Sequence, residues 1–200
     1  MKNKNATWGQ IVSNSKKLIT FIDLCGHEKY LKTTMFGLVG LLPDYGMIMV
    51  GANMGVSKMT KEHLGISLAL KIPFFIVVTK IDIAPPEIYE KTVNNLIKIL
   101  KRPGVGKLPI IVKEDMDLDQ QCEGLHNGKV VPIFRISNVT GEGLPQLKEF
   151  LPKLRSRVGS SGEFKSPEDP VEFMIDGEYV VPGVGIVVAG TMRAGTVVKG

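Results

Sequence analysis

The chain has 200 residues, of which 44% are hydrophobic and 22% are charged, and its formal net charge is +5. This is an ordinary globular balance that can fill a core, so it excludes a chain too polar to fold on its own. The modest excess of lysine and arginine permits contact with RNA but does not by itself indicate it, because the charges must first gather on one face.

The cysteine content and the N-terminus indicate a reducing, cytoplasmic compartment. The chain has two isolated cysteines, Cys25 and Cys122, and its N-terminal residues are polar, without the apolar segment of a secretory leader. The most apolar stretch, residues 37–56, is interrupted by Pro43 and Asp44. A membrane span needs about 20 mostly apolar residues, so we expect no membrane association.

Four apolar runs are predicted to be buried strands. They are continuous rather than alternating, which is typical of a parallel sheet covered on both faces. The runs are residues 18–23, 46–51, 74–80 and 131–137.

Helical patterns lie between these runs. Apolar residues recur at helical spacing over residues 29–38, Thr60 can cap a helix that carries Leu64 and Leu68, and Pro86 can begin a helix that ends near Leu100. A further helix is predicted from leucines at helical spacing over residues 144–154. Because strands and helices alternate, the sequence predicts an α/β fold with a doubly wound, mostly parallel sheet.

Two regions depart from this alternation. Residues 108–129 are predicted to form a short extra strand and then a polar acidic loop at 114–129. After residue 157 the chain becomes rich in Ser, Gly and Pro, and then alternates with a period of two, with further strand-like runs at 185–191 and 195–200. We therefore expect a main domain at 1–157, a linker at 158–169, and the start of an all-β barrel at 170–200.

Polar motifs stand at the ends of three predicted strands. Residues 23–27 read Asp-Leu-Cys-Gly-His, residues 79–82 read Thr-Lys-Ile-Asp, and residues 137–139 read Ser-Asn-Val. Each motif alone is weak, but ligands of a doubly wound sheet bind outside the carboxyl ends of its strands, where these motifs would meet. Their order and placement together are specific.

The combination resembles the guanine-nucleotide-binding domain of translational GTPases of the elongation factor Tu type, and most closely the group of GTP-binding proteins 1 and 2. The resemblance covers nearly the whole chain. It implies that the full protein binds GTP or GDP with Mg²⁺ and hydrolyses GTP in the cytoplasm. It also implies a role in translation or RNA surveillance, with the ribosome, tRNA or the mRNA-decay machinery as candidate partners.

The resemblance assigns guanine recognition to the second and third motifs. Asp82 would accept hydrogen bonds from the guanine N1–H and exocyclic amine, a donor pair that adenine lacks, and Lys80 would lay its stem across the purine. Thr79 replaces the commoner Asn of this motif and would bridge neighbouring loops. Ser137, Asn138 and Val139 would offer backbone N–H groups to guanine O6.

The resemblance assigns phosphate sensing to the first motif. Asp23 would lie near Mg²⁺, through a water, because Mg²⁺ keeps several waters when it binds proteins. The N–H of Gly26 would approach the terminal phosphate, and His27 would orient the attacking water. The helix near residues 29–38 would then be the segment that moves on hydrolysis.

The sequence lacks one part that a GTPase needs. No Gly-x-x-x-x-Gly-Lys-Ser/Thr phosphate loop precedes Asp23. We therefore expect a GTP-binding domain without its first strand and phosphate loop, shortened at both ends and inactive by itself. A non-catalytic interaction module that kept the fold stays open as an alternative.

Two other interpretations of the first motif are less well supported. His27-Glu28 suggests a zinc helix of the His-Glu-x-x-His type, but Leu31 stands where the second His is needed. Cys25 as a nucleophile needs an oriented base, which nothing in the sequence supplies, so we interpret it as a small buried thiol.

Overall fold

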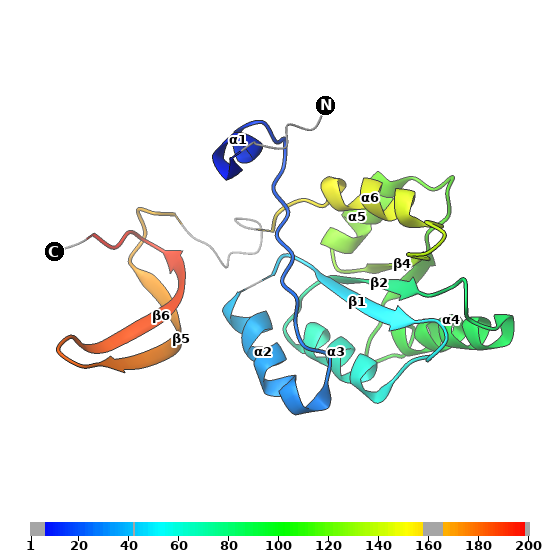
Figure 1. Ribbon diagram of the computed structural model, residues 1–200, viewed down its shortest axis with the longest axis horizontal. Coiled ribbons are helices and arrows are strands. Elements are labelled where there is room, and N and C mark those ends of the chain that lie inside the picture. Colours follow the sequence, from blue (N-terminus) through cyan, green and yellow to red (C-terminus); the bar gives the residue numbers. More distant parts are fainter. Residues whose placement is uncertain (1–6, 42, 158–165, 199–200) are drawn as a thin grey trace.

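The computed structural model describes residues 7–41, 43–157 and 166–198. Its main body is a parallel four-stranded sheet in the order β1-β2-β4-β3, with helices on both faces (Figure 1). The strands are β1 (Gly46–Gly51), β2 (Phe74–Thr79), β3 (Leu108–Ile111) and β4 (Val130–Arg135). The helices that cover the sheet are α3 (Lys58–Ala69), α4 (Pro86–Leu100), α5 (Leu118–His126) and α6 (Leu144–Lys153). The predicted doubly wound α/β fold is confirmed.

Strand β2 shows why continuous apolar runs form this sheet. Its side chains alternate between two cores, with Ile76 and Val78 facing α3 and α4, and Phe75 and Val77 facing α5 and α6. All four are at most 2% exposed. A strand buried on both faces has no place for a polar residue, so its sequence cannot alternate.

The second core is centred on three aromatic rings. Phe150 on α6 lies with its ring centroid 5.3 Å from that of Phe75 and 4.8 Å from that of Phe134. The rings of Phe75 and Phe134 meet edge to face at 5.9 Å. These separations lie in the favourable range for aromatic pairs, and the cluster fixes α6 against the sheet.

The first residues of α4 agree with the prediction from the sequence, whereas the N-cap of α3 differs from it. Pro86 occupies the first turn of α4, as predicted. Helix α3 begins earlier than predicted, because Ser57 and not Thr60 is its N-cap: the Ser57 Oγ accepts a hydrogen bond from the Thr60 N–H at 3.0 Å. Thr60 is buried in the first turn instead.

The acidic loop predicted at 114–129 is wrong, because most of it is helix α5. Asp117 caps this helix, because its Oδ1 accepts hydrogen bonds from the N–H groups of Asp119 and Gln120 in the first turn. Leu118, Cys122 and Leu125 then fall on one face and are buried in the second core. The helical spacing of these three residues was the signal, and the surrounding charges obscured it.

The strand predicted at residues 18–23 is also wrong. The segment is irregular and exposed, with Leu18 at 67% and Phe21 at 63% exposure. A strand is stabilised only when its N–H and C=O groups pair with a neighbour. Among the described residues, β1 pairs with β2 alone, and residues 18–23 do not add to its other edge.

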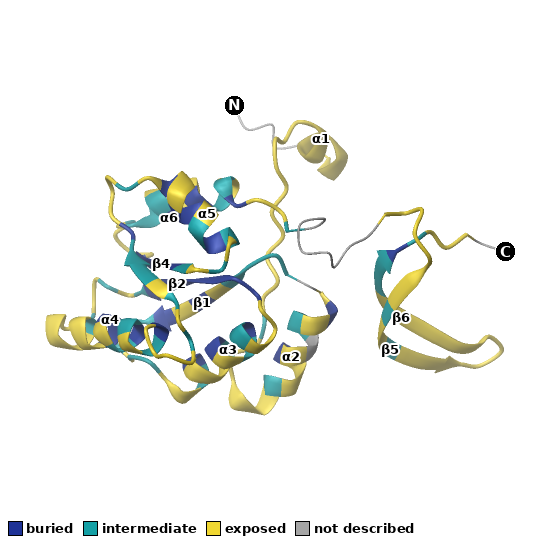
Figure 2. Cartoon of the chain, turned by 180° about the vertical axis from the view of Figure 1, so that it is seen from behind, coloured by how far each residue is buried: buried dark blue, intermediate teal, exposed yellow. Residues whose placement is uncertain are grey.

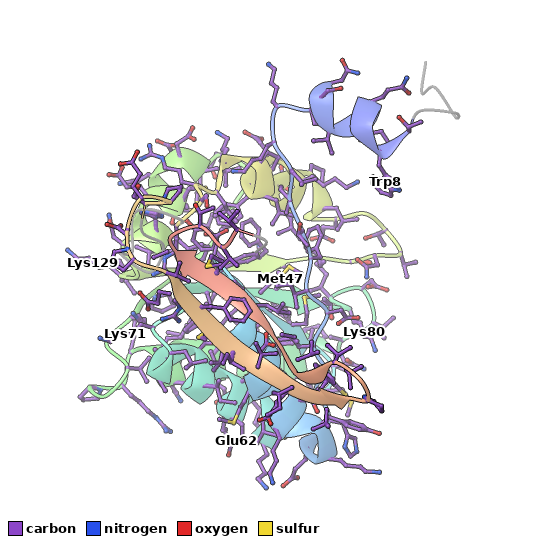
Figure 3. The ribbon with its side chains drawn as sticks, turned by 90° about the vertical axis from the view of Figure 1, so that its left-hand side faces the viewer. Trp8, Met47, Glu62, Lys71, Lys80 and Lys129 are labelled. Atoms are coloured by element: carbon purple, nitrogen blue, oxygen red, sulfur yellow. The ribbon has the colours of Figure 1, made fainter. Side chains whose placement is uncertain are left out.

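Before the sheet, the chain forms the short helix α1 (Trp8–Ser13), which the sequence did not predict, then η1 (Glu28–Tyr30) and α2 (Leu31–Gly40). Helix α2 confirms the helix predicted near residues 29–38. Trp8, at the start of α1 (Figure 3), is 80% exposed.

After the main body, residues 172–194 form an antiparallel hairpin of β5 (Glu172–Val181) and β6 (Gly185–Ala194). The hairpin is mostly exposed (Figure 2) and touches the end of α2, where the Thr191 Oγ1 donates a hydrogen bond to the Gly40 carbonyl at 2.9 Å. The further strand predicted at 195–200 is absent from residues 195–198, the part of it that the structure describes. The domain limits stay predictions, since residues 158–165 of the linker lie outside the described residues.

No helix within the described residues is both long enough and apolar enough to cross a membrane.

Candidate functional site

The carboxyl ends of β2 and β4 bring two of the three motifs together. The Ile136 N–H donates to the Val78 carbonyl at 2.8 Å, and the Ile81 N–H makes a longer bond of 3.5 Å to the Ile136 carbonyl. These bonds continue the parallel ladder past the last paired residues. The turn at 79–82 and the loop at 137–139 therefore lie side by side, as the sequence predicted for neighbouring strand ends.

The turn after β2 has an unusual backbone. Lys80 has φ +61°, a left-handed conformation that costs a residue with a Cβ free energy and that clusters at functional sites. Asp82 follows on the surface. Its carboxylate makes no hydrogen bond or ion pair with any described residue, so both of its oxygens can accept bonds from a ligand.

Ser137 organises the loop after β4. It is fully buried, and its Oγ accepts hydrogen bonds from the N–H groups of Val139 and Thr140, both at 3.1 Å. Its own N–H donates to the Glu142 carbonyl at 3.0 Å. Sequence reasoning gave Ser137 a role in binding, and the structure adds this role in shaping the loop.

A glycine that sequence reasoning missed closes the same loop. Gly143 has φ +71°, and a Cβ at this position would lie 1.9 Å from the Arg135 carbonyl oxygen. No side chain fits between the loop and the strand it follows. The signal available in the sequence was the pair of glycines on either side of Glu142.

The backbone N–H donors of the loop at 137–139 differ in one detail from those expected from the sequence. The Val139 N–H already donates to Ser137, whereas the Asn138 N–H has no hydrogen-bond partner among the described residues. Both side chains are on the surface, with Val139 86% exposed. Asn138 therefore has the backbone donor that is most available to a ligand oxygen.

Replacing Ser137 by alanine tests its role in the loop. Ser137→Ala should lower the free energy of unfolding by about 1–2 kcal/mol, because the N–H groups of Val139 and Thr140 lose their shared acceptor. Urea denaturation measures this change. Ser13→Ala, the same change at an exposed residue of α1, is the control and should leave the midpoint nearly unaltered. A Ser137→Ala midpoint equal to that of the parent chain would remove Ser137 from this role.

The first motif lies on an exposed segment. Asp23, Gly26 and His27 are all on the surface. His27 caps η1, with its Nδ1 accepting a hydrogen bond from the Lys29 N–H at 3.1 Å, which leaves its Nε2 on the other side of the ring for a ligand. A Cβ on Gly26 would come within 4.0 Å of the His63 ring, so this segment passes beside α3.

One surface ion pair joins this segment to α3. Lys58 Nζ lies 2.8 Å from Glu28 Oε1, and this hydrogen bond lowers the pKa of Glu28 and raises that of Lys58. Both side chains are more than 60% exposed. Exposed pairs of this kind contribute little stability, so this pair by itself holds the segment to α3 only weakly.

The structure does not bring the first motif into contact with the other two: within the described residues, no hydrogen bond or ion pair joins residues 23–27 to residues 79–82 or 137–139. Nor does any group of three or more His, Cys, Asp or Glu side chains in this part of the chain lie close enough together to hold a metal ion.

The interpretation of Cys25 as a buried thiol is wrong, because it is exposed. Cys122 is the buried cysteine, and burial, with the nearby Asp119 carboxylate, raises the pKa of its thiol to about 11. A thiol with that pKa is protonated at neutral pH and is a structural part of the second core.

Comparison with known proteins shows which family the chain resembles. Residues 4–156 match the family described as the elongation factor Tu GTP binding domain. The chain is 52% identical over 190 residues to GTP-binding protein 1 of Xenopus laevis, covering 95% of this chain and 28% of that protein. It is 45% identical over 187 residues to GTP-binding protein 2 of Homo sapiens, covering 93% of this chain and 31% of that protein. The chain thus spans less than a third of the length of these relatives.

A more distant relative and a solved structure agree with this match. The selenocysteine-specific elongation factor of Haemophilus influenzae is 31% identical over 182 residues, covering 90% of this chain and 24% of that protein. The structure of translation elongation factor SelB from Methanococcus maripaludis, in complex with the GTP analogue GPPNHP, shares the fold, with a TM-score of 0.56 and 24% identity over 86% of this chain and 32% of that one. The chain therefore belongs to the translational GTPases that carry the elongation factor Tu GTP-binding domain.

Proposed function

We propose that the protein binds guanine nucleotides at the carboxyl edge of its sheet. The observation that carries this proposal is the contact between the turn at 79–82 and the loop at 137–139, which places Asp82 and the Asn138 N–H at one edge. Asp82 accepts the two guanine donors, Lys80 covers the purine, and Thr79 links the loops. The Asn138 N–H donates to guanine O6, in the loop that Ser137 and Val139 shape.

Asp23, Gly26 and His27 supply the phosphate-sensing part of the same site. A single exposed carboxylate suits Mg²⁺, which binds proteins through one or two carboxylates and takes its other ligands from phosphates and water. Asp23 therefore fits this ion, and the ion would neutralise charge that develops on the phosphates. The Gly26 N–H contacts the terminal phosphate, and the His27 Nε2 orients the attacking water.

The full-length protein then hydrolyses GTP and acts as a translation factor or in RNA surveillance in the cytoplasm, with the ribosome, tRNA or the mRNA-decay machinery as partner. The family match and the GTP-binding and elongation-factor relatives support this proposal.

The second candidate function is a non-catalytic interaction module. The observation that favours it is that the 200 residues contain no Gly-x-x-x-x-Gly-Lys-Ser/Thr segment. Such a loop surrounds the phosphates with backbone N–H groups and adds a lysine, so a site without it loses most of its hold on the triphosphate. A transcript that encodes this loop upstream of Met1 would favour the enzyme over the module.

The 200-residue chain alone should hydrolyse GTP at no more than the background rate, because its sequence contains no phosphate-loop motif to hold the triphosphate against Asp23 and His27. Release of inorganic phosphate measures the rate, and His27→Ala is the paired variant. Turnover above background that His27→Ala abolishes would contradict this expectation and would show that the phosphate-sensing residues suffice.

A further inference from the structure

A cavity of about 260 Å³ opens at the amino end of the sheet. It lies between the end of α3, the start of β2 and the turn that follows α5. The proposed guanine site is at the opposite, carboxyl end of the same strands. Figure 3 shows this separation, with Lys71 and Lys129 on one side of the molecule and Lys80 on the other.

The charged side chains in the cavity wall are all basic. Lys71, Lys107 and Arg157 line it together with His126, and no Asp or Glu is among the described residues that line it. Ser67 and Asn127 add polar groups, and the rest of the wall is mostly apolar. A concave site with several cations and low-dielectric walls concentrates positive potential.

Two of these residues are anchored by hydrogen bonds, Lys107 through its side chain and Arg157 through its main chain. Lys107 Nζ donates a hydrogen bond to the Gly128 carbonyl, which places the ammonium beside the turn after α5. The Arg157 N–H donates to Asp44 Oδ1 at 2.5 Å, which anchors the main chain at that residue. The Lys107 ammonium is therefore held in place before a ligand binds, which lowers the entropy cost of binding.

The backbone of Lys71 provides a second, independent observation. The residue ends α3 in a left-handed conformation, with φ +54°, and the Ile72 N–H bonds back to the Ser67 carbonyl at 2.9 Å. Glycine is the usual residue at this position of a helix terminus, because a Cβ is disfavoured there. Lys80 in the guanine motif is the other non-glycine residue with positive φ in the described parts of the chain.

We propose that this cavity is a second anion site, which binds a phosphate group. A lysine at a strained position, where glycine would be more stable, supports a functional role for its side chain. The volume is close to the lower end of small-molecule pockets, about 300 Å³, so it accommodates a phosphate with a sugar-sized group attached. The phosphate belongs either to a small phosphate ester or to the backbone of an RNA strand.

Residue-resolved amide shifts of the isotope-labelled chain test the proposal, with inorganic pyrophosphate as the first probe. The amides of Lys71, Ile72, Lys107 and Gly128 should shift in a saturable way. Lys71→Gly should weaken this binding about tenfold, since it removes a charge-assisted hydrogen bond. It should also raise the melting temperature, because glycine relieves the strained backbone, so the loss cannot come from unfolding.

Lys107→Gln should weaken binding to a similar degree. Lys61→Gln is the matched control, because Lys61 is exposed on the same α3 helix, outside the cavity, and its loss changes the net charge equally. The control should bind pyrophosphate as the parent chain does.

A short single-stranded RNA is the second probe and distinguishes the source of the phosphate. Shifts of the cavity amides with RNA but not with pyrophosphate, falling steeply with salt, identify a nucleic-acid backbone. Shifts with pyrophosphate alone identify a small phosphate ester. The proposal is overturned if neither probe shifts these amides, or if binding survives unchanged in both Lys71→Gly and Lys107→Gln.

Discussion

Replacing Asp82 by asparagine in the full-length protein should weaken GTP binding about a hundredfold and improve binding of xanthosine triphosphate. In the proposed site the carboxylate accepts two hydrogens from guanine. An amide can accept only one of them, and its NH₂ group then faces the exocyclic amine, donor against donor. Xanthine has a carbonyl oxygen in place of that amine, so the asparagine NH₂ gains an acceptor. Competition between the two nucleotides for the parent protein and the variant measures the change.

Asp176→Asn is the matched control for this experiment. Asp176 is also exposed and lies in strand β5 of the hairpin, outside the parallel sheet, so the same loss of charge there should leave the nucleotide preference as it is. An unchanged preference in Asp82→Asn would remove Asp82 from base recognition, while leaving open whether the nucleotide binds at this edge.

Replacing Phe150 by alanine should lower the free energy of unfolding by about 3–5 kcal/mol, a large part of the stability of a domain of this size. Phe150 is fully buried, and its removal leaves a cavity between Phe75 and Phe134 that the rigid sheet cannot close. Equilibrium denaturation in urea, followed by far-UV circular dichroism, measures the loss.

The control is Phe21→Ala, the same chemical change in the exposed segment before η1. Phe21 is 63% exposed, so its loss should alter the free energy of unfolding by no more than about 0.5 kcal/mol. A cost close to that of Phe150→Ala would mean that residues 18–23 are buried, as the apolar sequence suggested, and not exposed.

Much of the fold could be predicted because the sequence patterns coincide with the physical demands of a parallel sheet. The run at 74–80 has no polar residue before Thr79, which a strand between two helical layers requires, and β2 occupies that position. Pro86 and the spacing of apolar residues up to Leu100 likewise predicted α4, because both express the local geometry of a helix.

The wrong predictions concern segments whose local sequence pattern is compatible with several tertiary environments. Residues 18–23 are as apolar as a buried strand, but no neighbour in the described chain pairs with them. Helix α5 was not predicted, because acidic residues dominate that stretch, although Leu118, Cys122 and Leu125 have the spacing of a buried helix face. Exposure of Cys25 was also unpredictable, because its environment depends on where the segment before η1 lies.

The sequence by itself determined the types of residue at the candidate site: an aspartate and a lysine after β2, a serine loop after β4, and the Asp-x-x-Gly-His segment before α2. These are chemical identities, and no folding is needed to read them. Tertiary structure decided which of them meet. Parallel pairing of β2 with β4 joins the 79–82 turn to the loop of Ser137, because neighbouring parallel strands end at the same edge. The segment at 23–27 has no such ladder, so its distance from the 79–82 turn and the 137–139 loop depends on tertiary contacts that its own residues do not specify.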